Sequence, residues 1–451
     1  MPLDKPRDNS LRGTLMRGGI GGIVIKVAQV LITFATTTLL ARTCGSDGYG
    51  VYVFVFAVLQ LLGIPAELGT SVLLVREVAA CAAKGQWGAL RGVIRRSRFV
   101  VGGVSVGLGA LTLLVALVGA GDPGSHDGRL FATFLAGSAL LPLIALTNLH
   151  AASLRGLGEI VKGQLPGLII RPGAFLVLAL VASYAGTRGP LSPQLAMRLH
   201  AIGAAGAFVV GWMLLARAMP TVVRRAVPEY EMKRWARSSL SLTFIAGLQI
   251  INSQTDIVML GLFRTPDVVG VYRVAVQCSL LVVLGLDIAN MVVSPLMSRL
   301  YSEGDLVRLQ RLTRVSARLV LASAIPVALV FGLFGSWILG RIFGAEYVAG
   351  LVPLGILAAG QIVNASAGAV VMLLNMTGRE ASVARGFVVS GVLNVVLNLA
   401  FIPRWGMNGA AAATAICIVV WNLYLCRATA RELGISCWAF GPTARGPGSM
   451  P

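Results

Sequence analysis

Residues 252–277, NSQTDIVMLGLFRTPDVVGVYRVAVQ, combine two apolar runs with a short turn and two charges. Asp256 lies inside the first run, and Arg273 lies just inside the second. An ionised group costs several kcal/mol at the centre of a bilayer, so charges placed there are functional candidates by default. Asp256 and Arg273 are therefore the first candidate site residues.

The composition of the whole chain indicates an all-α polytopic membrane protein. Of its 451 residues, 56% are apolar and only 12% are charged, whereas about a quarter are charged in an ordinary soluble domain. Apolar runs of roughly 20 residues recur, as a hydrocarbon core about 30 Å thick requires. They predict twelve transmembrane helices, at 19–41, 49–75, 99–121, 130–152, 165–185, 199–218, 240–263, 271–297, 318–343, 350–375, 385–402 and 409–427.

The basic residues predict the orientation of the chain. Of the 38 Lys and Arg residues, 28 fall in segments on the side of the N-terminus, 7 fall in turns on the opposite side, and 3 fall within spans. Short cytoplasmic loops carry the excess of Lys and Arg, so both termini are expected in the cytoplasm and the protein in the cytoplasmic membrane. This asymmetry explains most of the net charge of +20 and argues against nucleic acid as a partner.

A shift of about 220 residues brings the two halves of the chain into register. The matching pairs are Asp47–Tyr52 with Asp267–Tyr272, Leu154–Glu159 with Asn375–Glu380, and residues 167–170 with 386–389. Both halves start inside and hold six spans, which predicts parallel repeats with a substrate site between them. The expected organisation is a cytoplasmic N-terminal segment (1–18), two six-helix lobes (19–218 and 240–427), a cytoplasmic linker between them (219–239), and a cytoplasmic tail (428–451).

Helical spacing gathers the polar residues of the spans onto single faces. Three cations lie within spans, Lys26, Arg171 and Arg273. A hydrated cavity lined by cations suits an anionic head group, whereas cations facing lipid would be very costly. The alternative is structural: the amides would join helices, and Asp256 would form an ion pair with Lys26 or Arg273.

Cofactor chemistry has little support in the sequence. The six cysteines form no C-x-x-C pair, and the three histidines are scattered, so no metal or cofactor is expected. No nucleophile motif or phosphate-binding glycine loop occurs. The short outer turns hold only isolated acids, which disfavours a membrane-bound glycan polymerase, ligase or glycosyltransferase. The chain is therefore predicted not to be an enzyme.

Three stretches resemble a known family. Leu39–Glu77 resembles the N-terminal signature of polysaccharide-exporting flippases, Thr255–Gln277 resembles their mid-chain signature, and Ile402–Ile416 (IPRWGMNGAAAATAI) resembles the pattern that opens their last span. The family is the Wzx-type oligosaccharide flippases of the multidrug/oligosaccharidyl-lipid/polysaccharide (MOP) transporter superfamily. The resemblance implies a MATE-like, V-shaped pair of six-helix lobes around a cation-lined cavity. It also implies a polyprenyl-diphosphate-linked oligosaccharide as substrate, flipped for cell-surface polysaccharide biosynthesis.

With this resemblance, the candidate residues take roles in alternating access. The expected substrate-binding residues are Lys26, Arg171, Arg273, Gln29, Gln277 and Asn252, with the cations attracting the diphosphate. The expected ion-coupling residues, for H⁺ or Na⁺, are Asp256, Glu67 and Asp287. Expected partners are the lipid-linked oligosaccharide, membrane lipids, glycosyltransferases and a polysaccharide polymerase. A multidrug or small-molecule exporter on the same fold is the alternative, kept open by the three acids.

Overall fold

The computed structural model describes residues 8–119, 126–184 and 191–440, which are helical throughout apart from short turns. Residues 1–7 and 441–451, parts of the predicted N-terminal segment and tail, lie outside the described residues. The elements are α1 (Asp8–Glu67), α2 (Thr70–Ala83), α3 (Trp87–Val118), α4 (His126–Gly137), α5 (Leu140–Gly156), α6 (Ile160–Leu165), η1 (Pro166–Ile170), α7 (Arg171–Tyr184), α8 (Pro193–Ala218), α9 (Thr221–Arg225), α10 (Met232–Phe263), α11 (Pro266–Val282), α12 (Leu284–Ser302), α13 (Leu306–Ile338), η2 (Leu339–Phe343), η3 (Ala345–Gly350), α14 (Leu351–Ala367), α15 (Val370–Met376) and α16 (Glu380–Leu433).

Within the described residues, eight helical stretches are long and apolar enough to cross a membrane, and α11 with α12, bent by 44°, makes nine. Two of the stretches, α1 and α16, each consist of two helices joined at a non-helical glycine, Gly45 and Gly406. The 32-residue helix α10 has the length of a span but is less apolar than these stretches. The sequence left gaps of several residues at 42–48 and 403–408, where the structure turns the chain at one glycine.

Contacts divide the chain into two compact units. The first comprises residues up to Leu40 together with Leu59–Gly247, and the second comprises Ala41–Val58 together with the chain from Leu248 onward. The second span of the sequence is therefore shared, since its first half packs with the C-terminal unit. The lobe boundaries expected from the sequence stay a prediction.

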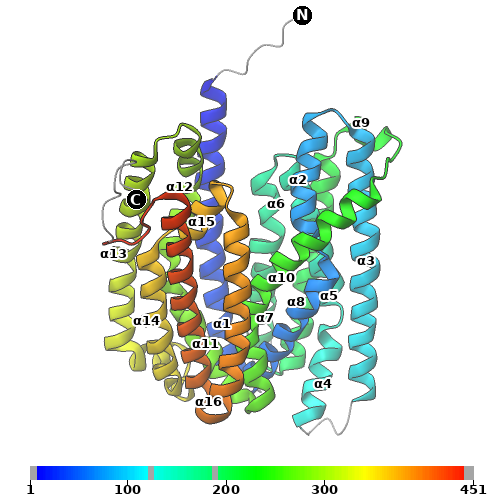
Figure 1. Ribbon diagram of the computed structural model, residues 1–451. Helices are drawn as coiled ribbons and strands as arrows, with labels where there is room; N and C mark the ends of the chain where they lie inside the picture. The colour runs from blue at the N-terminus through cyan, green and yellow to red at the C-terminus, as the bar shows by residue number, and fades with distance from the viewer. Residues whose placement is uncertain (1–7, 120–125, 185–190, 441–451) are drawn as a thin grey trace, which may run out of the picture. The chain divides into compact units, whose positions relative to one another are not determined.

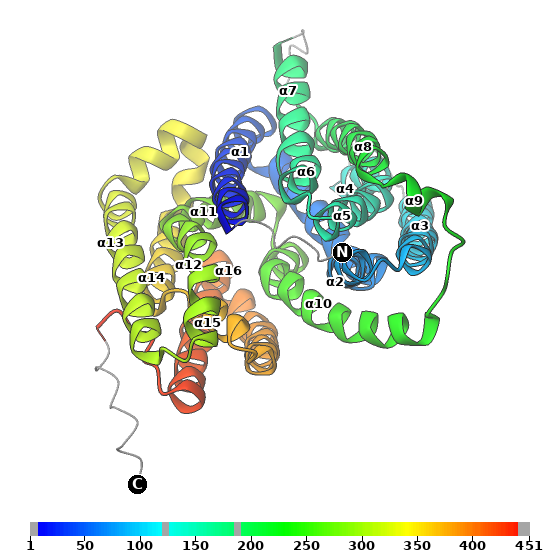
Figure 2. The same cartoon turned by 90° about the horizontal axis from the view of Figure 1, so that it is seen from above.

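The first unit is built around α5. This helix packs against α2, α3 and α8, and α8 also contacts α4 and α7 (Figure 2). Leu74, Leu90 and Leu149 are fully buried in its core. Many apolar side chains on α3, such as Val118, are exposed instead, as expected for a surface that faces lipid.

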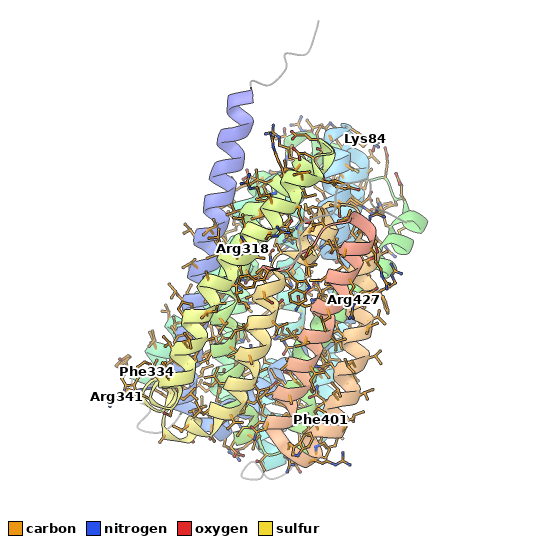
Figure 3. The ribbon with its side chains drawn as sticks, turned by 60° about the vertical axis from the view of Figure 1, so that its left-hand side comes forward. Lys84, Arg318, Phe334, Arg341, Phe401 and Arg427 are labelled. Carbon is orange, nitrogen blue, oxygen red and sulfur yellow. The ribbon has the colours of Figure 1, made fainter. Side chains whose placement is uncertain are left out.

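In the second unit α14 packs against α11, α13 and α16 (Figure 1). Phe334 on α13, Arg341 on η2 and Phe401 on α16 lie at one end of this unit, and Arg318 and Arg427 lie farther from that end (Figure 3). The Gly406 reversal follows Phe401 closely, and Arg341 is the third residue of the π turn that follows α13.

The repeat predicted from the sequence appears in the local structure. Four helices end in the same kind of turn, each with its own glycine of positive φ. In each turn the N–H of the residue after the glycine donates to a carbonyl five residues earlier: Gln86 to Cys81, Glu159 to Leu154, Asp305 to Leu300, and Arg379 to Leu374. This is the Schellman arrangement, which satisfies the last carbonyls of a helix and requires a left-handed residue. The four glycines, Gly85, Gly158, Gly304 and Gly378, form two pairs separated by about 220 residues.

The two copies of the Gly-Val-Tyr motif pack on each other inside the second unit. A Cβ at Gly50 would overlap the carbonyl oxygen of Pro266, and a Cβ at Gly270 would overlap that of Ser46. Each glycine thus meets the carbonyl four residues before its counterpart, so the contact has local two-fold symmetry. Only glycine permits so close an approach of two backbones.

At the end of the second unit where the two Gly-Val-Tyr helices begin, polar side chains bind backbone groups that lack helical partners. Arg264 donates to the carbonyls of Ile402 and Pro403, at 3.1 and 2.7 Å. These carbonyls have no helical partner because the helix is interrupted at Gly406. Glu346 accepts from both the N–H and the hydroxyl of Ser46, at 2.9 and 2.8 Å, at the helix start that follows Gly45. A carboxylate is favourable there because it faces the positive end of the helix dipole.

We predict that Gly50→Ala lowers the melting temperature of the purified protein. Alanine favours a helix over glycine by about 1 kcal/mol. The new methyl group would nevertheless force the two motif helices apart, at a cost of roughly 1–3 kcal/mol. The matched control is Gly63→Ala on the same helix, where an added Cβ meets no atom within 4 Å. Thermal unfolding in detergent measures both, and equal melting temperatures would contradict the close contact.

Candidate functional site

The structure buries Asp256 in the second unit and surrounds its carboxylate with donors. The Tyr272 hydroxyl donates to Oδ2 at 2.7 Å, and the Ile257 N–H donates to Oδ1 at 2.8 Å. The Thr414 hydroxyl lies 3.4 Å from Oδ2, too far for a strong hydrogen bond. Tyr272 reaches Asp256 because α10 and α11 form the hairpin that the sequence predicted, with only two residues between them.

The two candidate residues of α11, Arg273 and Gln277, lie one helical turn apart on that helix. Arg273 is half-buried, and its positive charge acts on the Asp256 carboxylate. Gln277, one turn further along, is buried. The carboxylate therefore combines a strong phenol donor with a nearby cation, both from the short stretch singled out in the sequence.

An asparagine-lined pocket of about 180 Å³ adjoins Thr414 in the second unit. Asn252 lines it and donates to the carbonyls of Leu248 and Phe387, at 3.0 and 3.2 Å. Asn422 donates to Asn364 Oδ1 at 3.2 Å. The side-chain oxygens of Asn252 and Asn422 are buried without a hydrogen-bond partner among the described residues. An unsatisfied buried acceptor is costly, so these oxygens are suited to a hydrogen-bond donor or a cation from a ligand.

A second acid of the candidate set, half-buried Glu67, lies in the first unit. It accepts from Asn148 Nδ2 at 2.6 Å and from the Ser71 hydroxyl at 3.1 Å. The charge of Arg171 acts on the same carboxylate. The structure thus brings Glu67 and Arg171 together, although 104 positions separate them in the sequence.

Arg171 begins α7 directly after the π-helical turn η1. Its N–H donates to the carbonyl of Pro166, five residues earlier. Pro172 has no N–H, so the regular α-helical bonding of this segment is interrupted. Single π turns inside helices occur frequently at functional sites.

The remaining predicted residues have different surroundings. Lys26 and Gln29 are half-buried one turn apart on α1, in the first unit. Asp287 is exposed in the first turn of α12. It lies 15 positions beyond Tyr272 along a bent pair of helices, which is at most about 22 Å at 1.5 Å per residue. The roles assigned to all nine residues stay predictions.

Several residues of these sites were not identified as site residues from the sequence. Tyr272 was noted only as part of the repeated motif, whereas Asn148 and Thr414 were not singled out at all. The signal for Asn148 was an isolated amide in an apolar run, and a lone threonine among alanines gave none. Among the described residues, no group of three or more His, Cys, Asp or Glu side chains is placed to hold a metal ion.

Comparison with known proteins follows the fold. No protein-family model matches the chain. A probable low-salt glycan biosynthesis flippase of Haloferax volcanii, Agl15, is 23% identical over 413 residues, which cover 90% of this chain and 81% of that protein. An inward-facing MATE-family multidrug resistance transporter of the MOP superfamily has 14% identity and a TM-score of 0.71, over 89% of this chain and 96% of that one. The lipid II flippase MurJ, in an inward closed conformation, has 15% identity and a TM-score of 0.67, over 92% and 87%.

The chain is thus a multi-pass membrane protein with the fold of the MATE and MurJ transporters. It is similar to a MATE-family transporter of the MOP superfamily, the superfamily that its three motifs resemble. The prediction of an all-helical polytopic membrane fold is confirmed.

We predict that Tyr272→Phe destabilises the protein by about 1–3 kcal/mol, because a buried carboxylate oxygen loses its strongest donor. Shape and apolar area change little in this variant, so the lost hydrogen bond dominates. Tyr184→Phe, at a side chain that is 87% exposed, is the control. Thermal unfolding is the measurement, and similar melting temperatures for the two variants would show that the Tyr272 bond contributes nothing.

Proposed function

We propose that this protein flips a polyprenyl-diphosphate-linked oligosaccharide from the inner to the outer leaflet of the cytoplasmic membrane, for cell-surface polysaccharide biosynthesis. The observation that carries the proposal is the set of half-buried cations at span depth, Lys26, Arg171 and Arg273. The relationship to a probable glycan biosynthesis flippase supports the same function.

The three cations are suited to the diphosphate of such a carrier. Arginine offers a planar fork of donors that matches phosphate oxygens, and lysine offers a compact point charge. Their charges are tolerable within a bilayer only if an anion or water balances them. Gln29, Gln277 and Asn252 add hydrogen-bonding groups on the same helices, for contact with polar parts of the substrate.

We assign ion coupling to three acids, buried Asp256, half-buried Glu67 and exposed Asp287. Asp256 receives hydrogen bonds from neutral donors, so it can exchange a proton or a Na⁺ ion without breaking a short ion pair. Glu67 has a comparable set of amide and hydroxyl donors. A coupling ion drives transport only if it binds the inward-open and outward-open states with different affinity. Exposed Asp287 is the third proposed coupling residue.

The proposed orientation places both termini in the cytoplasm, on the basis of the Lys and Arg asymmetry. A cysteine at position 84 should then react with an impermeant maleimide only after the membrane is opened. Proposed partners are membrane lipids, the glycosyltransferases that build the lipid-linked glycan, and a polymerase that consumes it.

A multidrug exporter is the second candidate, favoured by the similarity to the MATE-family transporter. Such an exporter would rely on acids to bind cationic drugs. In the second unit, however, Arg273 lies close enough to act on Asp256, which weakens the attraction of that acid for a cation of drug size. Drug sensitivity of a deletion strain, without accumulation of lipid-linked glycan, would favour the exporter.

We predict that Lys26→Ala and Arg273→Ala each reduce glycan export by at least about tenfold, the effect of losing one hydrogen bond to a charged group. The measurement is the lipid-linked glycan that accumulates on the cytoplasmic side, with membrane insertion checked by immunoblot. Arg404→Ala, at an exposed arginine, is the control. Normal export in both variants would remove these cations from the site.

We predict that Asp256→Asn abolishes the dependence of transport on the ion gradient while the protein still folds. Asparagine has nearly the same shape and can still accept from Tyr272, but it neither titrates nor neutralises a cation. Transport is measured in vesicles with and without an imposed H⁺ or Na⁺ gradient. An unchanged gradient dependence would exclude a coupling role and leave Asp256 as a structural residue.

A further inference from the structure

A half-open pocket of about 280 Å³ lies in the first unit, next to the basic segments that the sequence assigns to the cytoplasmic side. Its walls come from three parts of the chain: the break between α1 and α2, the first half of α3, and the first turns of α10. Leu68, Leu73, Val100, Met232 and Trp235 form most of its apolar lining.

An unusual backbone break shapes this pocket. Leu68 has φ +48°, and Gly69 follows with φ +62°. A side chain other than glycine is rarely found in this left-handed region, so the conformation of Leu68 is held by its surroundings. Ser239 donates from its hydroxyl to the Leu68 carbonyl, and a Cβ at Gly69 would overlap the backbone of Thr243. The start of α10 is therefore fastened directly over the break.

One cation lines the pocket with an unsatisfied donor. Arg96 is half-buried, and its Nε is enclosed without a hydrogen-bond partner among the described residues. Its guanidinium lies 5.8 Å from the centre of the Phe99 ring. A guanidinium stays charged and a buried unpaired donor is costly, so the site calls for an anionic acceptor. The planar fork of donors on arginine matches the oxygens of a phosphate or a carboxylate.

Apart from Arg96, the lining of the pocket is suited to a ligand with both an apolar and an anionic part, and less suited to a free anion. Beside Arg96 the walls are mainly apolar, and buried Trp235 forms part of them. Arg91, Arg95 and Arg98 on the same helix add positive charge near the site. Basic residues attract the anionic lipids of the cytoplasmic leaflet, worth about 1 kcal/mol for each cation near the surface.

We propose that this pocket binds an anionic phospholipid of the inner leaflet, with the lipid phosphate on Arg96 and one acyl chain against Leu73 and Trp235. This lipid is a bound partner and not the transported substrate, so the proposal stands apart from the proposed flipping activity. It has a consequence for the fold, because α10 belongs to the first unit up to Gly247 and to the second unit from Leu248. A lipid held at its start contacts the segment of chain that links the two units.

The test is lipid binding by native mass spectrometry, with the full chain in detergent micelles that contain phosphatidylglycerol or phosphatidylcholine. The wild-type protein should retain phosphatidylglycerol preferentially, and Arg96→Gln should weaken that binding about tenfold, the loss of one charge-assisted contact. Arg95→Gln removes the same charge from an exposed position one residue away and should weaken binding clearly less than Arg96→Gln does, because it takes away only the surface attraction of one cation. Val100→Trp should also prevent binding, because it fills the pocket while Arg96 stays in place.

Three results would overturn the proposal. Equal weakening by Arg95→Gln and Arg96→Gln would show a diffuse electrostatic attraction without a site. Equal protection of the protein against thermal unfolding by inorganic phosphate and by phosphatidylglycerol would show a free-anion site. Binding of a polyprenyl phosphate without binding of phosphatidylglycerol would assign the pocket to the carrier lipid.

Discussion

The absence of water from the middle of a bilayer is the constraint on which this structure depends. Every polar group at that depth needs a partner within the protein. The protein meets this need with side-chain hydrogen bonds. A tyrosine donates to Asp256, an asparagine donates to Glu67, and an arginine donates to a carbonyl freed near Gly406. Three of the polar residues that retain an unsatisfied atom, Arg96, Asn252 and Asn422, line pockets.

The Gly-Val-Tyr motif occurs in both halves of the chain, but the charges Asp256 and Arg273 near it occur in the second half only. Gly50-Val-Tyr52 and Gly270-Val-Tyr272 make the same backbone contact with each other. Their tyrosines have different surroundings: Tyr52 stacks with Tyr49 and Phe56, at centroid distances of 6.4 and 6.1 Å, while Tyr272 donates to Asp256. The residues that match Asp256 and Arg273 in the first copy are Thr36 and Val53. The repeated motif therefore accounts for the helix packing, whereas the charged site belongs to one copy only.

The spans, the hairpin and the repeat could be predicted because each depends on local sequence. Apolar length fixes a span, and a glycine at the same place in each half marks a Schellman turn. The sequence also predicted turns between residues 41 and 49 and between 402 and 409. It did not show that one glycine, Gly45 or Gly406, makes each turn, since glycine is frequent in this chain. The partners of the acids were also beyond prediction: Asn148 is 81 positions from Glu67 and Thr414 is 158 from Asp256. One sequence contains no information on which side chains of distant spans face each other.

Backbone irregularities coincide with the proposed sites. The π turn before Arg171 and the left-handed pair Leu68–Gly69 both interrupt helical hydrogen bonding near a cation. At membrane depth such interruptions are tolerated only where protein or a water-filled cavity covers the freed groups. Before Arg171, a regular helix would satisfy its backbone at lower cost and would present the guanidinium at a different angle. That the π turn persists there is best explained if the position of this guanidinium matters more than the stability that a regular helix would add. The Leu68–Gly69 break acts differently, because it shapes the pocket that Arg96 lines from another helix, α3.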